Sequence, residues 1–519
     1  MKGIILAGGR GTNKSERFIN YFITALLLVF CFLFADSLTH QYLKMDDTFL
    51  AGVFAAALIL ITLAYKRLSP VKPVYTAVFV FALAFLIRFA FVLILPSKQY
   101  SDYKSYYEAA VSLSKGLPYT GKASGLIGNF PELHGFIMIN AGLMFLFGTN
   151  IKVLLTIGCL ASAGTAVLIF LILYKRSETA AFLASFAYAL YPGNIAFSSI
   201  LTNQHLATFF YYASFIVLLQ KGNESFKFKA RKLALAGLFI GIAQVIRPIA
   251  APIVIAVLIY YILTELFSHR EAFRKLLHSA AILSFALVYI SVNLISSLIS
   301  CNLGLKKDIL DLSTDMRVYI VVGLDESTDG QISARAGQFR EADKATKKQM
   351  LSDAIKVHLH NPLRFLRLAL RKLNIVWGGA DNSAGAAIGG ERMILNDYKK
   401  SGGITKKQEY RLGTLDLFRD VLNKVDIAFM LLVMLFAIIG IWATRKDSSG
   451  WPAFFKWMLL GNIALRMIIE VQQRYRYVTM PAFIIFAAIG FLFLWEQLGQ
   501  IKFIRDRVLN KEIQESGSA

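Results

Sequence analysis

Long uninterrupted runs of apolar residues dominate the chain, with short polar segments between them. A helix of about 20 apolar residues crosses a hydrocarbon core of about 30 Å, and most of the runs approach this length. The shorter apolar stretch at 134–148 is predicted to be an interfacial helix instead. The pattern predicts an all-α polytopic membrane protein with twelve spans, near residues 18–36, 48–65, 74–95, 151–174, 178–197, 204–221, 232–247, 248–266, 278–300, 426–444, 452–470 and 478–497.

The charges between the predicted spans indicate which side of the membrane each loop faces. Short cytoplasmic loops are enriched in Lys and Arg. With a cytoplasmic N-terminus, the short loops on that side are basic, and the outer loop with Asp36, Asp46 and Asp47 is acidic. Counting 134–148 as a span would reverse every later loop. The basic residues on the predicted cytoplasmic side are Lys66, Arg67, Lys72, Lys175, Arg176, Lys221, Lys227, Lys229, Arg231, Lys232, Arg270, Arg274, Lys275, Arg445, Lys446, Lys502, Arg505 and Arg507.

This topology divides the chain into four parts. A cytoplasmic segment at 1–17 precedes a transmembrane module at 18–300, an extracytoplasmic segment at 301–425, and a C-terminal transmembrane module with a cytoplasmic tail at 426–519. The first module contains a second outer segment, the loop at 96–150. Long loops without a function are uncommon, so we expect the catalytic residues in these two outer segments.

Composition supports the membrane assignment and explains the net charge. The 519 residues are 56% hydrophobic and 17% charged, whereas soluble domains have about 25% charged residues. Basic cytoplasmic loops account for the net charge of +23, so no nucleic-acid partner is expected. Cys31, Cys159 and Cys301 are scattered and predict neither a disulfide framework nor a metal site. The first span lacks a small-residue cleavage site, so no cleavable signal peptide is expected.

The chain opens with MKGIILAGGRGT, which predicts a strand followed by a Gly-rich turn. These twelve residues resemble the start of sugar-1-phosphate nucleotidyltransferases, in which backbone N–H groups of such a turn bind phosphate. That family places an Arg directly after the Thr, where this chain has Asn13. Because the chain then enters its first span, no complete nucleotide-binding domain is expected.

The outer loop that follows the third span combines an acid with aromatic residues. Asp102 opens the segment, and Tyr103 and Tyr106 follow it. A carboxylate at the membrane surface can act as a general base towards a hydroxyl, or hold a divalent cation near a phosphate. Glu132 and His134 lie further along, directly before the predicted interfacial helix. By itself one carboxylate at the end of a span is more often an ordinary surface group, so Asp102 and the other four residues are candidates for a site.

The order of these features resembles glycosyltransferase family 39 and its relatives of the GT-C fold, which include protein O-mannosyltransferases and the aminoarabinose transferases of lipid A. The resemblance implies a GT-C fold, Asp102 as catalytic base, and transfer of a sugar from a polyprenyl-phosphate donor. The positions that carry it are Asp102, Tyr106, Ala109, Leu113, Gly116, Tyr119, Pro131 and Phe147-Gly148.

Three further places extend the resemblance and supply candidate substrate contacts. Many relatives have an acid where this chain has Asn203, and an amide is neither a base nor a strong metal ligand. This departure argues against a second carboxylate at that position and against a tightly bound metal, and it leaves a divalent cation as the one cofactor still open. Arg247 lies at the outer end of the seventh span, where it either contacts the donor phosphate or extends to the interface. Arg474 and Arg476 belong to an RY...P element on the predicted outer surface, and Arg binds phosphate bidentately.

Residues 361–373 predict an amphipathic helix within the second outer segment. Asn361 is a suitable N-cap, and Pro362 suits the first turn. Apolar residues share one face, and Arg residues lie beside it at helical spacing. Two interpretations remain open: an interfacial helix resting on anionic lipid, or a wall of the donor site with Arg371 or Lys372 near the phosphate.

These inferences predict a membrane glycosyltransferase that moves a hexosyl or pentosyl group from a polyprenyl-phosphate donor. The acceptor would be an extracytoplasmic glycan, lipid or protein of the cell envelope, with the enzyme in the plasma membrane and its active site facing outward. A polysaccharide polymerase or ligase is one alternative, and a lipid-linked sugar flippase or transporter is another. Transporters often show inverted repeats and midplane sites, and neither pattern is found in the sequence.

Overall fold

The computed structural model describes residues 14–43, 52, 56–63, 72–95, 98–117, 131–220, 225–262, 272–305, 315–447 and 450–516. The nucleotidyltransferase-like segment at 1–12, part of the predicted span 48–65, and Tyr119 lie outside these ranges. So do several of the loop charges, namely Asp46, Asp47, Lys66, Arg67, Lys221 and Arg270.

Every regular element within the described residues is a helix, so this part of the chain is all-α. Most predicted spans coincide with one helix each. The agreement is closest for α7 (Ile151–Tyr174), where the Asn150 side chain caps the first turn. The other helices that match one predicted span are α1 (Lys14–Leu43), α3 (Pro73–Ile94), α10 (Gln204–Leu219), α11 (Phe226–Ile246), α12 (Ala251–Tyr261), α13 (Ala272–Asn302) and α20 (Gly450–Ile468).

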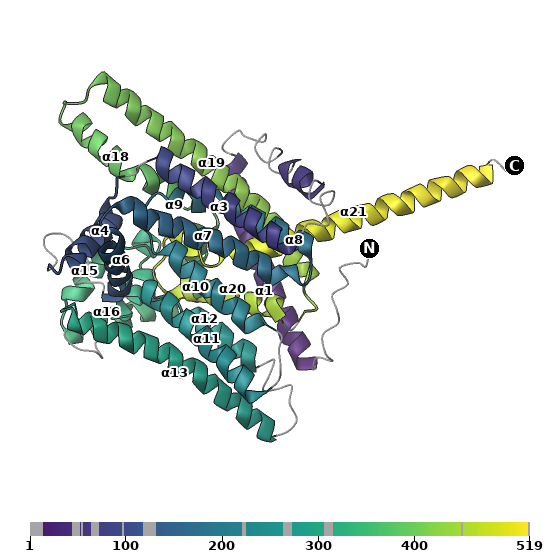
Figure 1. The fold of residues 1–519 in the computed structure, drawn as a ribbon, viewed down its shortest axis with the longest axis horizontal. Coiled ribbons are helices and arrows are strands. Elements are labelled where there is room, and N and C mark those ends of the chain that lie inside the picture. The colour runs from purple at the N-terminus through teal and green to yellow at the C-terminus, as the bar shows by residue number, and fades with distance from the viewer. Residues whose placement is uncertain are drawn as a thin grey trace.

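Six helices among the described residues are long and apolar enough to cross a membrane. Their outward faces fit lipid rather than water. Large apolar side chains along α13 are exposed at helical spacing, for example Leu283, Leu287, Ile290 and Leu294, and α13 lies at the edge of the bundle (Figure 1). These features are those of a membrane-embedded protein. The six segments are Phe18–Leu43, Pro73–Ile94, Ile151–Tyr174, Ala280–Asn302, Lys406–Ala443 and Met480–Gly499.

Two predicted spans have different bounds in the structure. The prediction of one helix over 178–197 is wrong, because the chain forms α8 (Glu178–Ala189) and then α9 (Pro192–Phe197). Pro192 lacks the N–H that a continuous helix would need. The predicted span 426–444 is only the second half of α19 (Lys406–Ala443), which a capping box at Thr405 begins much earlier.

A buried arginine stabilises the break between α8 and α9. Arg88 on α3 is fully buried and donates to the carbonyl oxygens of Ala189 at 2.9 Å and Tyr188 at 3.0 Å. Carbonyl groups at a helix end have no partner within the helix. The Nε of Arg88 also donates to Oδ1 of Asn194 on α9, at 2.9 Å. Arg88 therefore holds three neighbouring helices together, a structural role that the sequence analysis did not assign.

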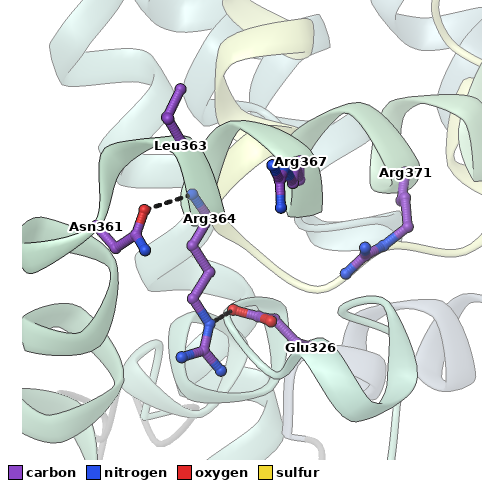
Figure 2. Close-up of a pocket in the computed structure, with 6 residues that line it drawn as sticks. All are labelled: Glu326, Asn361, Leu363, Arg364, Arg367 and Arg371. Carbon is purple, nitrogen blue, oxygen red and sulfur yellow. Dashed lines mark hydrogen bonds and ion pairs between the residues drawn. The ribbon is translucent and has the colours of Figure 1, made fainter.

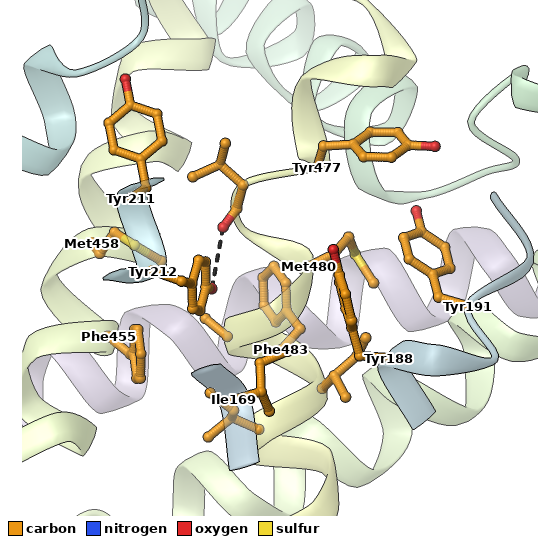
Figure 3. Close-up of a cluster of buried hydrophobic side chains, with 14 of the residues drawn as sticks. Ile169, Tyr188, Tyr191, Tyr211, Tyr212, Phe455, Met458, Tyr477, Met480 and Phe483 are labelled. Atoms are coloured by element: carbon orange, nitrogen blue, oxygen red, sulfur yellow. Dashed lines mark hydrogen bonds between the residues drawn. The ribbon is translucent and has the colours of Figure 1, made fainter. Parts of the chain in front are cut away.

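The core continues through aromatic residues from several helices. Figure 3 shows Tyr211 and Tyr212 on α10, with the Tyr212 hydroxyl donating to the Val478 carbonyl at 3.2 Å. Close helix packing completes the core where α19 meets α21 (Met480–Ser516). A side chain on Gly440 would overlap the Phe486 backbone, and one on Gly490 would overlap the Phe436 backbone.

Shorter helices gather at one end of the bundle (Figure 1). The apolar stretch at 134–148, predicted to be an interfacial helix, forms the short helix α6 (His134–Phe147), preceded by the 3-10 helix η1 (Pro131–Leu133). We call this side the α4 end of the bundle. The other elements of the two predicted outer segments are α4 (Ser101–Ser114), α14 (Arg317–Gly323), η3 (Glu326–Thr328), α15 (Ala334–Glu341), α16 (Lys344–His360), α17 (Pro362–Trp377) and α18 (Ser383–Lys400).

Candidate functional site

Asp102 occupies the first turn of α4, with one face of that helix packed into the bundle. Tyr103 and Tyr106 are buried, and their rings meet edge to face at 6.4 Å between centroids. The Asp102 side chain keeps 36% of its surface exposed. Its Oδ2 accepts a hydrogen bond from Nη2 of Arg474 at 3.2 Å, and Nη1 of Arg474 donates to the Tyr103 hydroxyl at 3.3 Å. A carboxylate that solvent can reach is thus held beside a guanidinium group.

The two arginines of the short 3-10 helix η4 (Gln473–Arg476) have different partners. Arg474 reaches Asp102. Arg476 is fully buried, and its Nη2 lies 2.6 Å from Oδ2 of Asp426 and 3.6 Å from Oδ2 of Asp381. Arg476 is therefore already paired with two carboxylates, and the structure separates it from Asp102.

Three arginine side chains gather around Tyr475. The guanidinium carbon of Arg466 lies 4.4 Å from the centre of the Tyr475 ring, and that of Arg247 lies 5.2 Å from it. Arg474 is the preceding residue in the chain. We call Arg247, Arg466 and Arg474 the arginine cluster. It joins α11, α20 and η4 at the α4 end of the bundle.

Each member of the arginine cluster has a buried nitrogen without a hydrogen-bond partner among the described residues. These nitrogens are Nε of Arg247, Nη2 of Arg466 and Nε of Arg474. Buried polar groups are normally paired, and an unpaired guanidinium N–H is costly because its hydration is lost. Unsatisfied donors on three neighbouring cations would suit an anion with several acceptor oxygens, such as a phosphate group.

One acid and one amide orient the arginine cluster. Glu470 is buried, and its Oε2 accepts from the Tyr475 hydroxyl at 2.6 Å. Burial and the neighbouring Glu470 carboxylate raise the pKa of Tyr475, so the phenol remains a donor. Oδ1 of Asn203 accepts from Nη1 of Arg247 at 2.8 Å. Asn203 thus orients an arginine, which an amide oxygen can do without being a base.

Lys372 on α17 is an additional buried amine near the arginine cluster. Its Nζ donates to the carbonyl oxygens of Gly323 at 2.7 Å and Met467 at 3.0 Å. Burial, together with the smaller effect of the positive charge of Arg466, lowers the pKa of Lys372 to about 7, although Glu470 partly opposes the shift. Lys372 therefore belongs to the electrostatic environment of the arginine cluster.

The remaining candidate substrate contacts lie outside the arginine cluster or at its edge. Arg371 is half exposed on the far face of α17 and pairs with Asp329 at 2.7 Å, so the structure does not place it with Lys372. Glu132 accepts a hydrogen bond from the Tyr319 hydroxyl of α14. His134 is buried at the first residue of α6.

Sequence reasoning missed Arg466, Glu470 and Tyr475. Arg466 could have been found, because it lies near the end of the predicted span 452–470 on the same side as Arg474, where a basic residue is disfavoured. Glu470 carried no such signal. Its role depends on local hydrogen bonds with Tyr475 and Gln472, which the residue pattern alone did not indicate.

No family model and no curated protein matches the chain. Among the described residues, no group of three or more His, Cys, Asp or Glu side chains is arranged to hold a metal ion.

Proposed function

We propose that the chain is a membrane glycosyltransferase of the GT-C fold with twelve spans. It transfers a sugar from a polyprenyl-phosphate donor to a hydroxyl of an extracytoplasmic glycan, lipid or protein. The observation that carries this proposal is the contact between Asp102 and Arg474. It joins a solvent-accessible carboxylate to a cluster of cations with unsatisfied donors. Transfer from a phosphate-linked sugar needs a base for the acceptor hydroxyl next to groups that bind the phosphate.

The charge of the arginine cluster suits a phosphodiester. Arg247, Arg466 and Arg474 carry three positive charges, and Asp102 and Glu470 carry two negative charges. With the buried amine of Lys372 beside it, the cluster has a positive excess, which complements the negative charge that a sugar phosphodiester carries. As the bond to the sugar breaks, further charge develops on the phosphate, and donors already aimed at it stabilise that charge without reorganisation.

Asp102 acts as the general base in this mechanism. The acceptor O–H transfers its proton to the carboxylate, and the oxygen attacks the anomeric carbon. The bond between that carbon and the phosphate oxygen breaks, and its electron pair stays on the oxygen. The products are the glycosylated acceptor and a polyprenyl phosphate. A single displacement inverts the anomeric carbon.

The loop charges support an orientation in which the α4 end faces outward. The short loops at the opposite end include Lys175, Arg176, Arg445 and Lys446, as expected of a cytoplasmic side. We propose that in a bacterial cell the site lies at the outer surface of the plasma membrane, where cell-envelope acceptors occur. No nucleotide donor is needed on that side.

The test is donor consumption by the purified full chain. A panel of radiolabelled polyprenyl-phosphate sugars is incubated with the protein and an envelope extract as acceptor, and release of polyprenyl phosphate is measured. The proposal expects turnover of at least one donor. If no donor is consumed, while liposomes containing the protein move lipid-linked sugar between leaflets, the chain is a transporter and the proposal fails.

A further inference from the structure

The exposed face of α17 carries two different rows of side chains. Successive residues of an α-helix are about 100° apart, so apolar and basic positions separate along the face. Leu363 is 67% exposed and Leu366 is 46% exposed, although a water-facing surface would favour polar residues. We call Leu363, Leu366 and Leu370 the leucine row, and Arg364, Arg367 and Arg371 the arginine row.

The arginine row lines an open pocket of about 330 Å³ together with Glu326 (Figure 2). Arg364 forms an ion pair with Glu326, and Arg371 forms one with Asp329. Arg367 has no ion-pair partner within the described residues. Three cations against two partly exposed acids leave the pocket positive, so its charge complements an anion.

The position of α17 places both rows near the ends of membrane helices. The Trp377 ring at the end of α17 stacks on Phe34 of α1 at 5.4 Å between centroids. Lys372 bonds to the Met467 carbonyl at the end of α20. α1 is one of the helices that are long and apolar enough to cross a membrane. We therefore expect α17 to lie near the boundary between acyl chains and head groups.

We propose that the arginine row binds the phosphate of an anionic bilayer phospholipid, whose acyl chains contact the leucine row. A soluble phosphate ester would use the arginines but would leave the exposed leucines in water. An anionic phospholipid accounts for both rows, because its phosphate can contact the arginine row while its acyl chains contact the leucine row. This site is separate from the arginine cluster and does not depend on the proposed transferase activity.

Native mass spectrometry of the full chain in neutral detergent tests the proposal. Phosphatidylglycerol is titrated in parallel with phosphatidylcholine and with soluble glycerol 1-phosphate. The expected result is preferential retention of phosphatidylglycerol. Arg367→Gln weakens that binding about fivefold. The matched control is Lys348→Gln, which removes one exposed charge from α16 outside the pocket and leaves binding unchanged.

A second variant changes binding in the opposite direction. Glu326→Gln removes the acid that pairs with Arg364, so it strengthens phosphatidylglycerol binding. Thermal unfolding of each variant establishes that it is folded. The proposal is overturned if phosphatidylcholine is retained as well as phosphatidylglycerol, if glycerol 1-phosphate displaces the lipid at equal concentration, or if Arg367→Gln behaves like Lys348→Gln.

Discussion

Asp102 and Arg474 are 372 positions apart in the chain, and their side chains form an ion pair at 3.2 Å. The contact joins the first turn of α4 to the short helix before α21. It combines the one acid that the sequence analysis chose as a base with the arginine cluster around Tyr475. The two halves of the proposed chemistry are thus brought together by tertiary structure rather than by proximity in sequence.

Arg466 is expected to contribute to donor binding. Arg466→Gln removes one of three cations around Tyr475, so affinity for a polyprenyl-phosphate sugar should fall by about tenfold or more, because hydrogen bonds to charged groups contribute about 1.5–3 kcal/mol. Donor titration calorimetry measures the effect. Arg419→Gln, a change on the half-exposed part of α19, serves as the matched control. Equal affinities for the two variants would remove Arg466 from the site.

Arg474 and Arg476, separated by one residue, should give different phenotypes when substituted. Arg476→Gln leaves Asp381 and Asp426 buried without their cation, which costs about 3–5 kcal/mol of stability. Arg474→Gln affects a partly exposed pair and should leave stability nearly unchanged while donor binding weakens. Thermal unfolding and donor titration of both variants measure the two effects. A stable Arg476→Gln protein would contradict the structural role of that buried ion pair.

Gly390 on α18 is expected to position Asp102 indirectly. A side chain at Gly390 would overlap the Lys98 carbonyl, which lies just before α4. Gly390→Ala should therefore displace the start of α4 and lower kcat more than it raises KM. Gly413→Ala on α19 adds the same methyl group where no atom lies within 4 Å. If both variants keep the same kcat, the close approach at Gly390 does not position Asp102.

Lys372 should make stability depend on pH. Its pKa is about 7 in the folded protein, below the usual value of 10.5, chiefly because of burial. Between these values the unfolded chain binds more protons than the folded chain. The free energy of unfolding should therefore rise from pH 7 towards pH 10, by up to about 1.4 kcal/mol per pH unit. Denaturation across this range should show a smaller rise in Lys372→Met. Parallel profiles would exclude a contribution from Lys372.

Local signals in the sequence predicted much of the fold. The start of α17 follows from Asn361, whose side chain accepts from the Arg364 N–H at 3.1 Å, and from Pro362. The bounds of α7 follow from a long apolar run with a cap. The break after α8 was missed, although Pro192 was visible, because its stability depends on Arg88 from another helix.

The candidate site was only partly predictable. Asp102, Arg247 and Arg474 carried local signals, and the structure brings them to one end of the bundle. Arg474 and Arg476 carried the same signal, and only their tertiary partners separate their roles. In the sequence, Arg371 and Lys372 were equal alternatives for a phosphate contact, but the two side chains lie on opposite faces of α17.

The most direct test of the central claim is sugar transfer by Asp102→Asn, with donor binding measured on the same samples. The substitution removes the base and keeps a side chain of the same size beside Arg474. The proposed mechanism predicts that the wild type consumes a polyprenyl-phosphate sugar, and that the variant still binds this donor but transfers its sugar at least about a hundredfold more slowly. Normal transfer by the variant would contradict the assignment of Asp102 as the catalytic base.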